Sequence, residues 1–412
     1  MFLNTIPLVA VRWCVVVAIS VSTICAQDAV QRAERQKILI LTCDGGSGHK
    51  SAATVLEQTL RNDYDLEFVN PFTCDIILTQ AGEKIYSTLL RWNFIRTINV
   101  LNCTIAPIFF HYQRASIAKR MGTVFDEKKP DMVISIMPFI NHSLYQAAHE
   151  RNIPFLLITL DFDIRLWLHD FKGHTDAKFL VTLWTENQVS KRYLSSKKIA
   201  PDNVQILGPA VRQDFLKQHH DKAAIRTTWN IPDNKPVVML MRGGTGSTKL
   251  TDYTKQLLTL KHPAHLLVCI GDAKTLETQL KALPPSEHVT FSIIPKTDKI
   301  ADLMAVSTVL VTAPSPNTCN EALYSKLPML IDRSGESLIW EKAGVRFVQE
   351  NGCAEVFRNY RTLKNLVTKY ITQPVKLESY KELPRFDKRI NNVVAQLFTT
   401  ASTKGVLNNE HC

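Results

Sequence analysis

The chain has 412 residues, 45% of them hydrophobic and 21% charged, which is typical of a globular protein and long for a single core. Its 49 Lys and Arg against 38 Asp and Glu give a formal charge of +11, which favours an anionic partner. The nine cysteines form no C-x-x-C pair and no zinc-like spacing, which argues against a disulfide framework or a structural metal site. We therefore expect two α/β domains.

The first 36 residues stand apart from the rest. Residues 6–26 are apolar except for Arg12 and a few small polar residues, a pattern typical of a membrane anchor or of a signal peptide ending near Ala26. A third interpretation is an N-terminal extension with no role in the fold. Basic residues follow the apolar run at positions 32, 35 and 37, and this bias favours a cytoplasmic location for the remainder of the chain.

The first half of the chain alternates between apolar runs and helical patterns. Residues 37–43 form an apolar run, a glycine-rich loop follows at 44–51, and a helix is expected through about residue 60. Further strands of this half are expected at 132–137, 154–160, 179–184 and 204–207. This alternation predicts a parallel sheet.

The second half repeats the pattern. Its strands are expected at 236–241, 265–270, 289–293, 308–311 and 328–331. The sequence therefore predicts two doubly wound, Rossmann-like domains whose ligands bind at the carboxyl ends of the strands, in a cleft between them. We expect an apolar segment at 1–36, one domain at 37–210, a second at 211–375, and at 376–412 a helix that packs back on the first domain, followed by a tail.

The first glycine-rich loop carries a histidine at the start of a helix. Gly48, Lys50 and Ser51 resemble a phosphate-binding P-loop, but His49 intervenes and the earlier glycine is missing. Gly46 and Gly48 allow the backbone to approach a ligand closely. The positive helix end lowers the pKa of an imidazole, so His49 is a candidate proton acceptor; the alternative is a surface histidine that caps the helix.

Two further loops lie at equivalent places in the second half. The loop at 242–247 contains Gly243, Gly244 and Gly246, whose backbone amides can face a phosphate. In the segment 313–323, Asn317 or Thr318 is expected to cap a helix and to place Glu321 on its first turn. Glu321 is then either a capping-box carboxylate or an acceptor for a ribose diol.

These loops resemble those of the monogalactosyldiacylglycerol synthase and processive diacylglycerol glycosyltransferase family. That family is related to the N-acetylglucosaminyltransferase of peptidoglycan lipid synthesis. The resemblance extends from about residue 37 to residue 370. It rests on the segments 45–52, 129–135, 167–169, 208–212, 241–246, 315–323 and 348–353.

The resemblance implies a GT-B fold and an enzyme of glycolipid synthesis. A UDP-sugar is then held mainly by the second domain, and diacylglycerol or a similar lipid is held by the first domain at a membrane surface. We expect direct displacement with inversion, in which His49, or a carboxylate such as Asp161 acting with it, takes the proton of the acceptor hydroxyl. The UDP-sugar, which donates galactose or glucose, is a substrate, so no cofactor and no metal are expected.

The resemblance also assigns the donor-binding residues. Arg212 lies near the diphosphate, the glycines at 243, 244 and 246 form the donor loop, Thr318 contacts a phosphate, and Glu321 binds the ribose. The resemblance also places Ser315, Asn317 and Glu336 in the donor site, although the family usually has other residues there; Thr245 and Trp340 depart from the family as well. These differences leave open the identity of the donor sugar and whether activity is retained.

The stretch 84–122 has six basic residues and no acidic residue, interleaved with aromatic side chains. Trp92 and Arg96 belong to it and are candidates for contact with an anionic membrane surface. The alternative is a helical pair with its aromatic side chains in the core. Single-stranded nucleic acid would suit the same pattern, but no nucleic-acid module accompanies it, so no nucleic-acid partner is expected.

Three other functions remain open at this point. A nucleotide-sugar epimerase shares the GT-B layout and needs no lipid. A lipid-linked N-acetylglucosaminyltransferase would use a different donor and acceptor. A lipid- or nucleotide-binding relative that has lost its activity would explain the altered donor residues.

Overall fold

The structure is a computed structural model that describes residues 35–43, 47–73, 94–171, 173, 175–217, 220–243, 247–375, 377 and 383–407, with residues 82, 84–86, 88–90 and 92. The predicted anchor or signal segment lies outside the described residues. Of the candidate site residues, Gly46, Gly244 and Gly246 also lie outside them.

The strands of the first half form one six-stranded parallel sheet in the order β2-β1-β3-β4-β5-β6. They are β1 (Lys37–Leu41), β2 (Asp65–Val69), β3 (Met132–Ser135), β4 (Phe155–Ile158), β5 (Phe179–Leu183) and β6 (Val204–Ile206). Strand β2 was not predicted. It lies at the edge of the sheet, and only one of its five residues is buried, so it lacks the continuous apolar run of a central strand.

The second half forms another six-stranded parallel sheet in the order β12-β11-β10-β7-β8-β9. Its strands are β7 (Val237–Met241), β8 (Ala264–Gly271), β9 (Val289–Pro295), β10 (Val309–Thr312), β11 (Met329–Asp332) and β12 (Ala354–Phe357). Strand β12 was missed for the same reason as β2: it is an edge strand, half-buried in its middle. The two doubly wound sheets confirm the predicted fold class.

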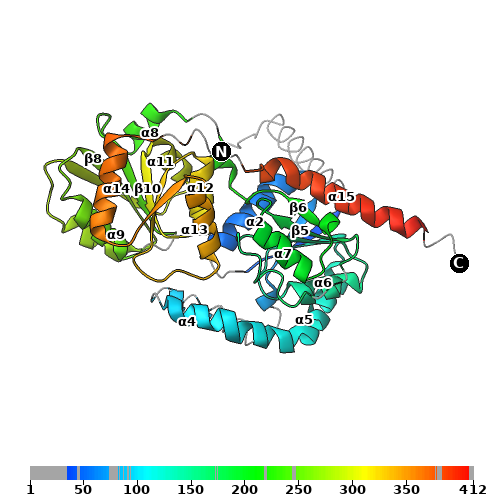
Figure 1. The fold of residues 1–412 in the computed structure, drawn as a ribbon. Helices are drawn as coiled ribbons and strands as arrows, with labels where there is room; N and C mark the ends of the chain where they lie inside the picture. The colour runs from blue at the N-terminus through cyan, green and yellow to red at the C-terminus, as the bar shows by residue number, and fades with distance from the viewer. Residues whose placement is uncertain are drawn as a thin grey trace, which may run out of the picture.

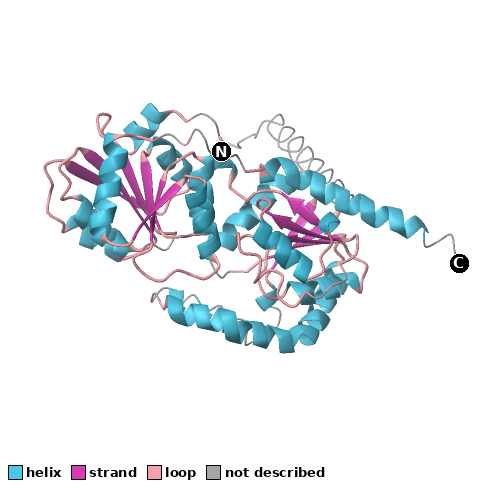
Figure 2. Cartoon of the chain, viewed as in Figure 1, coloured by secondary structure: helices cyan, strands magenta, loops and turns pink. Residues whose placement is uncertain are grey.

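Helices cover both faces of each sheet (Figures 1 and 2). Those of the first half are α2 (Ser47–Leu60), α4 (Ile95–Val100), η2 (Leu101–Ile105), α5 (Ala106–Lys128), α6 (Asn141–His149) and α7 (Gln188–Ser196). Those of the second half are α8 (Lys222–Thr228), α9 (Lys249–Leu257), α10 (Lys274–Lys281), α11 (Ile300–Val306), α12 (Pro316–Tyr324), α13 (Glu341–Glu350) and α14 (Tyr360–Thr372).

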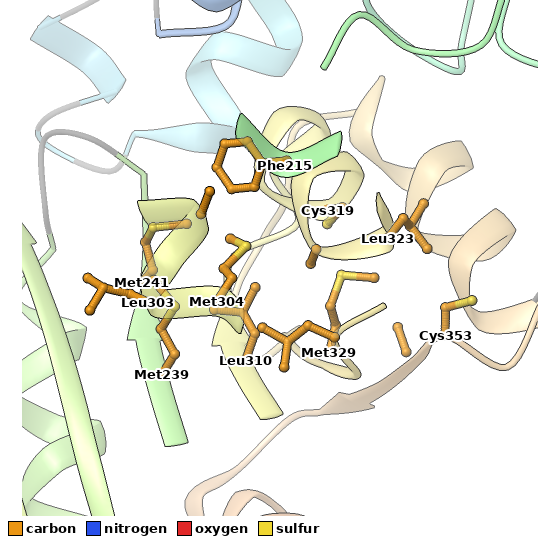
Figure 3. Close-up of a cluster of buried hydrophobic side chains, with 14 of the residues drawn as sticks. Phe215, Met239, Met241, Leu303, Met304, Leu310, Cys319, Leu323, Met329 and Cys353 are labelled. Carbon is orange, nitrogen blue, oxygen red and sulfur yellow. The ribbon is translucent and has the colours of Figure 1, made fainter. Parts of the chain in front are cut away.

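Each central strand contributes to two cores, which is why it reads as a continuous apolar run. Along β1, Leu39 and Leu41 belong to one buried cluster, whereas Ile38 and Ile40 belong to another on the opposite face. Figure 3 shows one core of the second half, in which Cys319 and Leu323 of α12 lie over Met239 of β7 and Leu310 of β10. Helix α12 is thus held firmly against the strands that precede the predicted donor loops.

The last helix, α15 (Phe386–Leu407), returns to the first sheet, where Phe386 and Ile390 pack in the same cluster as Ile38. It was predicted to begin at residue 376. It begins at Phe386, directly after Pro384 and Arg385, because a proline inside a helix removes a hydrogen bond and clashes with the preceding turn.

The chain passes between the halves twice, after Gly208 and before α15, and these two segments contact each other at the Pro384 carbonyl, which Tyr324 of α12 also binds. The hydroxyl of Tyr324 donates to the carbonyl of Pro384 at 2.8 Å. A Cβ added at Gly208, whose φ is +79°, would lie 1.9 Å from the same carbonyl oxygen. Only glycine therefore fits at this contact.

Helices α4, η2 and α5 follow one another directly and run beneath both halves of the molecule (Figure 1). Residues of η2 form a turn of π-helix, which shifts the register of side chains along the run. None of the helices within the described residues has the length and apolarity needed to cross a membrane.

Candidate functional site

Both glycine-rich loops leave their sheets at the points where the strand order reverses. In the first sheet β1 lies between β2 and β3, and in the second β7 lies between β8 and β10. The chain therefore leaves neighbouring strands toward opposite faces, which opens a crevice at their carboxyl ends. The first glycine-rich loop follows β1 and the second follows β7, so each sheet presents one loop at its ligand-binding position.

The N-termini of α2 and α12 approach each other between the two sheets. A Cβ added at Gly48 on α2 would lie 3.5 Å from the side-chain nitrogen of Asn317 on α12. Neither helix has an acidic residue in its first turn. The partial positive charges of both helix ends are thus available to an anion such as a diphosphate.

Helix α12 begins earlier than predicted. Its N-cap is Ser315 and its first residue is Pro316, so Asn317 and Thr318 lie inside the first turn rather than capping it. Proline suits that position because its fixed φ is already helical and the missing N–H is not needed there. The shift places Glu321 in the second turn, out of reach of a capping box, which removes that interpretation.

His49 lies on the first turn of α2, with its Nδ1 at 2.9 Å from the carbonyl oxygen of Ile136, just beyond β3. Because a carbonyl only accepts, Nδ1 carries the proton and Nε2 is left as an acceptor. Burial lowers the pKa of His49 to about 4, and the hydrogen bond to Ile136 opposes the shift. The ring is neutral at physiological pH, and burial rather than the helix end is the main cause.

Asp161 follows strand β4 and is linked to His49 through Trp167. The indole nitrogen of Trp167 donates to Asp161 Oδ2 at 3.1 Å, and the centres of the Trp167 and His49 rings are 6.2 Å apart. Burial raises the pKa of Asp161 to about 7; the Trp167 hydrogen bond opposes this, and the charge of Asp163 adds to it. The buried Trp167 thus joins the two candidate proton acceptors, a role that was not predicted.

A second carboxyl, Glu341, faces Asp161 from the other half of the molecule. It is the first residue of α13, and the backbone N–H of Leu338 donates to its Oε2 at 3.2 Å. Burial raises the pKa of Glu341 to about 8, and the nearby charge of Asp161 contributes to the rise. Glu336, the predicted carboxylate of this segment, is instead exposed in the loop between β11 and α13. An acidic residue at the start of a helix that follows a strand was the available signal for Glu341.

Arg212 and Glu321 bind each other. The Nε and one terminal nitrogen of Arg212 donate to Glu321 Oε1 at 3.0 and 2.7 Å. Burial raises the pKa of Glu321, whereas the Arg212 charge and its hydrogen bonds lower it. Within the described residues no hydrogen bond is recorded to Oε2, which is the oxygen left for a ligand.

The start of the second glycine-rich loop adjoins a charged network that was not predicted. Gly243 has a φ of +76°, a conformation that favours glycine. Beside it, Arg242 donates to Asp332 at 2.7 Å, and Lys249 donates to the same carboxylate at 2.9 Å. Burial raises the pKa of Asp332, but hydrogen bonds from Ser334, Tyr253 and Lys249 outweigh it and hold the pKa well below its usual range. The network ties the loop after β7 to the loop after β11.

Arg96 lies on α4, at the start of the helical run beneath both halves (Figure 1), and Trp92 precedes that helix in the sequence. Both are exposed, Trp92 by 68%. Not all aromatic side chains of this stretch are exposed: Phe110 stacks on Phe72 and Phe139 in the first core. The stretch therefore combines a packed face with an exposed face that carries apolar side chains.

The described residues contain no group of three or more His, Cys, Asp or Glu side chains placed to hold a metal ion. The polar groups that converge at the site are helix N-termini, the Arg212–Glu321 pair, and the His49, Asp161 and Glu341 side chains. Such an arrangement can bind a phosphorylated ligand at the second sheet and deprotonate a hydroxyl at the first.

The sequence is similar to characterised glycolipid enzymes. It is 23% identical to a processive diacylglycerol beta-glucosyltransferase of Bacillus subtilis over 361 residues, which cover 84% of this chain and 90% of that protein. It is 21% identical over 365 residues to the chloroplastic monogalactosyldiacylglycerol synthase 1 of Arabidopsis thaliana, covering 82% of this chain and 66% of that protein. No protein-family model matches the sequence.

Solved structures share the architecture. The crystal structure of MurG from Acinetobacter baumannii aligns with a TM-score of 0.60 at 11% identity, over 88% of this chain and 99% of that one. A UDP-GlcNAc 2-epimerase from Neisseria meningitidis, bound to UDP-GlcNAc, aligns with a TM-score of 0.53 at 15% identity, over 88% of this chain and all of that one. These alignments confirm the GT-B fold, and the sequence similarity confirms the resemblance to the diacylglycerol glycosyltransferases and monogalactosyldiacylglycerol synthases.

Proposed function

We propose that this relative of the diacylglycerol glycosyltransferases transfers a hexose, galactose or glucose, from a UDP-sugar to diacylglycerol with inversion. The observation that carries the proposal is the approach of the α2 and α12 N-termini at Gly48 and Asn317. A diphosphate bound there lies between an acceptor-side proton acceptor and a donor-side loop. The similarity of the whole sequence to glycolipid synthases supports the choice of a lipid acceptor.

His49 and Asp161 divide the handling of the acceptor proton. Nε2 of His49 accepts a hydrogen bond from the lipid hydroxyl and orients it. Asp161, with a pKa of about 7, takes the proton as the oxygen attacks the anomeric carbon from the face opposite the leaving UDP. At neutral pH a large fraction of a carboxyl with this pKa is ionised, and its carboxylate is basic enough to accept the proton.

The second half binds the donor. The α12 N-terminus, the side chain of Thr318 and the amides of the loop at 243–246 stabilise the charge that develops on the leaving UDP. Glu321 Oε2 accepts hydrogen bonds from the ribose diol, and Arg212 holds that carboxylate in place and adds positive charge near the diphosphate. Glu341 is protonated at neutral pH because its pKa is about 8, so it can donate a hydrogen bond to a hydroxyl of the sugar.

The helical run from α4 to α5 places the protein on an anionic membrane surface. Three of its exposed apolar side chains, at positions 105, 108 and 112, are spaced as on one helix face, and their exposed fractions are 55%, 59% and 80%. Exposed basic residues, including Arg96 and Arg114, accompany them. This combination suits insertion of apolar side chains among anionic headgroups, and it gives the enzyme access to its lipid acceptor.

The test is a transfer assay with the full chain, diacylglycerol in mixed vesicles, and radiolabelled UDP-galactose, UDP-glucose or UDP-N-acetylglucosamine. Label in a glycolipid with one of the first two donors supports the proposal. Label in lipid with UDP-N-acetylglucosamine alone indicates a lipid-linked N-acetylglucosaminyltransferase. Conversion of the donor without lipid indicates an epimerase, and binding without any turnover indicates a relative that has lost its activity.

A further inference from the structure

Asn99 of α4 joins the helical run beneath the molecule to the loop that precedes α13. Its side-chain nitrogen donates to the carbonyl oxygen of Ser337 at 3.0 Å. Its side-chain oxygen accepts from the backbone N–H of Ile339, also at 3.0 Å. The side-chain amide thus donates to and accepts from the backbone of this loop, as the backbone of a neighbouring β-strand does. The bonded residues are 238 and 240 positions away in the sequence. An amide can donate and accept in this way because its donor and its acceptor are separate atoms of one planar group.

The loop held by Asn99 also holds a buried carboxyl of the candidate site. Between the two residues bound by Asn99, the backbone N–H of Leu338 donates to Glu341 Oε2. Three consecutive residues are therefore fixed alternately by Asn99 and by Glu341. A shift of α4 relative to the second half would displace this loop and with it the Glu341 side chain.

Exposed apolar side chains lie close to Asn99 in the sequence. Val100, the neighbour of Asn99, is 54% exposed, whereas Asn99 itself is half-buried against the loop. Trp92 and Phe94 precede them with 68% and 55% exposure. The segment from Trp92 to Val100 thus exposes three apolar side chains and directs the Asn99 amide to the loop.

We propose that Asn99 is a positioning residue that couples attachment of this helical run to a lipid surface with the ordering of residues 334–341 at the donor-sugar site. The proposal rests on the function proposed above. Because coupling between two sites is reciprocal, a helix held at a surface stabilises the loop, and a loop closed on the donor stabilises the helix. The enzyme would then bind its water-soluble donor most tightly when it is already on the membrane that supplies the acceptor.

Hydrogen exchange of the full chain tests the contact itself. In Asn99→Ala we expect the amides of residues 334–342 to exchange about five-fold faster or more, with the largest change at Ile339, which loses its acceptor. In Asn99→Asp the acceptor remains, so Ile339 should stay better protected than in the alanine variant. Asn102→Ala, on the same run but without a recorded bond to this loop in the described residues, is the matched control.

Vesicles test the coupling. On vesicles of phosphatidylcholine with phosphatidylglycerol, exchange at 334–342 should slow in the wild type and in Asn102→Ala, but not in Asn99→Ala, although all three cosediment with the vesicles. Equal exchange in wild type and Asn99→Ala without vesicles, or equal slowing of both on vesicles, would overturn the proposal. Unchanged melting temperatures show that each variant is folded.

Kinetics supply the third measurement. On vesicles, Asn99→Ala should raise KM for the UDP-sugar about five-fold or more and leave KM for diacylglycerol unchanged. An unchanged donor KM together with altered exchange would also overturn the coupling. If the wild type transfers no sugar while the exchange results hold, the proposed function fails and the contact between helix and loop stands.

Discussion

His49 and Asp161 both lie beside the indole of Trp167, and burial moves their pKa values in opposite senses. Loss of hydration disfavours the charged form of each side chain, so the imidazole loses its proton more readily and the carboxyl retains its proton. The result is a neutral histidine with a pKa of about 4 and a carboxyl with a pKa of about 7. These environments give the two side chains different tasks at the same pH.

The pH dependence of transfer distinguishes these two groups. If Asp161 is the base, kcat/KM for the acceptor rises with pH through about 7, because only the ionised carboxylate accepts the proton. We expect Asp161→Asn to lower kcat at least about 100-fold. In Asp163→Asn, which removes a neighbouring charge that raises the Asp161 pKa, the rise should move to lower pH with transfer retained. A rise centred near pH 4 in the wild type would instead identify His49 as the base.

Glu341 makes the stability of the folded chain depend on pH. Its pKa is about 8 in the folded state and near 4.5 in an unfolded chain, so between these values the folded state binds more protons. Its contribution to stability is fully present below about pH 4.5 and is lost as the pH rises to about 8. Glu341→Gln should therefore flatten this decline and raise the melting temperature at pH 8 by a few degrees. Glu350→Gln, on the exposed end of the same helix, is the control, and an equal decline in both variants would contradict the prediction.

The proposed role of the Arg212–Glu321 pair in donor binding can be separated from its role in the fold. Glu321→Ala should weaken UDP binding about ten-fold or more by calorimetry, because a hydrogen bond to a charged group contributes about 1.5–3 kcal/mol. It should also destabilise the fold by roughly 1–3 kcal/mol, since the partly buried guanidinium of Arg212 then lacks its partner. Glu321→Gln keeps an oxygen for the ribose and serves as the milder variant. Unchanged affinity for UDP in both would assign the pair to the fold alone.

At the scale of elements, the helical run from α4 to α5 is the proposed membrane contact. Ile105→Glu combined with Ile108→Glu should abolish cosedimentation with vesicles of phosphatidylcholine and phosphatidylglycerol, because burying two carboxylates in the headgroup region is unfavourable. Val189→Glu, 78% exposed on α7, is the control and should leave binding unchanged. Retained binding by the double variant would place the membrane contact elsewhere in the chain.

The start of α12 illustrates how small shifts in an element alter a site. The sequence Ser-Pro-Asn-Thr offers three plausible N-caps, and local preference alone led to a start at Asn317 or Thr318. The helix instead begins at Pro316, held by the packing of Cys319 and Leu323 on the second sheet. With this earlier start, Glu321 lies beyond the first turn, where it binds Arg212.

At the scale of the whole molecule, the two halves contact each other through stacked aromatic side chains. Phe162, next to Asp161, stacks on Phe347 of α13 with ring centres 4.9 Å apart. Phe162→Ala should raise the ratio of UDP-sugar hydrolysis to lipid transfer, because water then enters a less tightly closed site. Phe162→Leu keeps an apolar contact and should fall between the alanine variant and the wild type. An unchanged ratio in the alanine variant would show that closure does not depend on this stack.

The sequence predicted the fold better than the site. Central strands such as β1 and β7 are buried on both faces, so their continuous apolar runs were visible, whereas the edge strands β2 and β12 are partly polar and were missed. Loops at the carboxyl ends of the strands could also be located from sequence. The approach of Trp167 to His49 and the bonds of Asn99 to residues 337 and 339 could not, since each joins residues far apart in sequence.

The touching crossover segments have a mechanical consequence. Two covalent connections join the halves, one at Gly208 and one before α15, and they meet at the Pro384 carbonyl. Two domains joined by a single chain segment can rotate freely relative to each other. Two connecting segments that contact each other restrict this rotation to bending about the point of contact. We therefore expect a hinge motion about this contact. Each time the cleft closes, the N-termini of α2 and α12 should return to the same relative position.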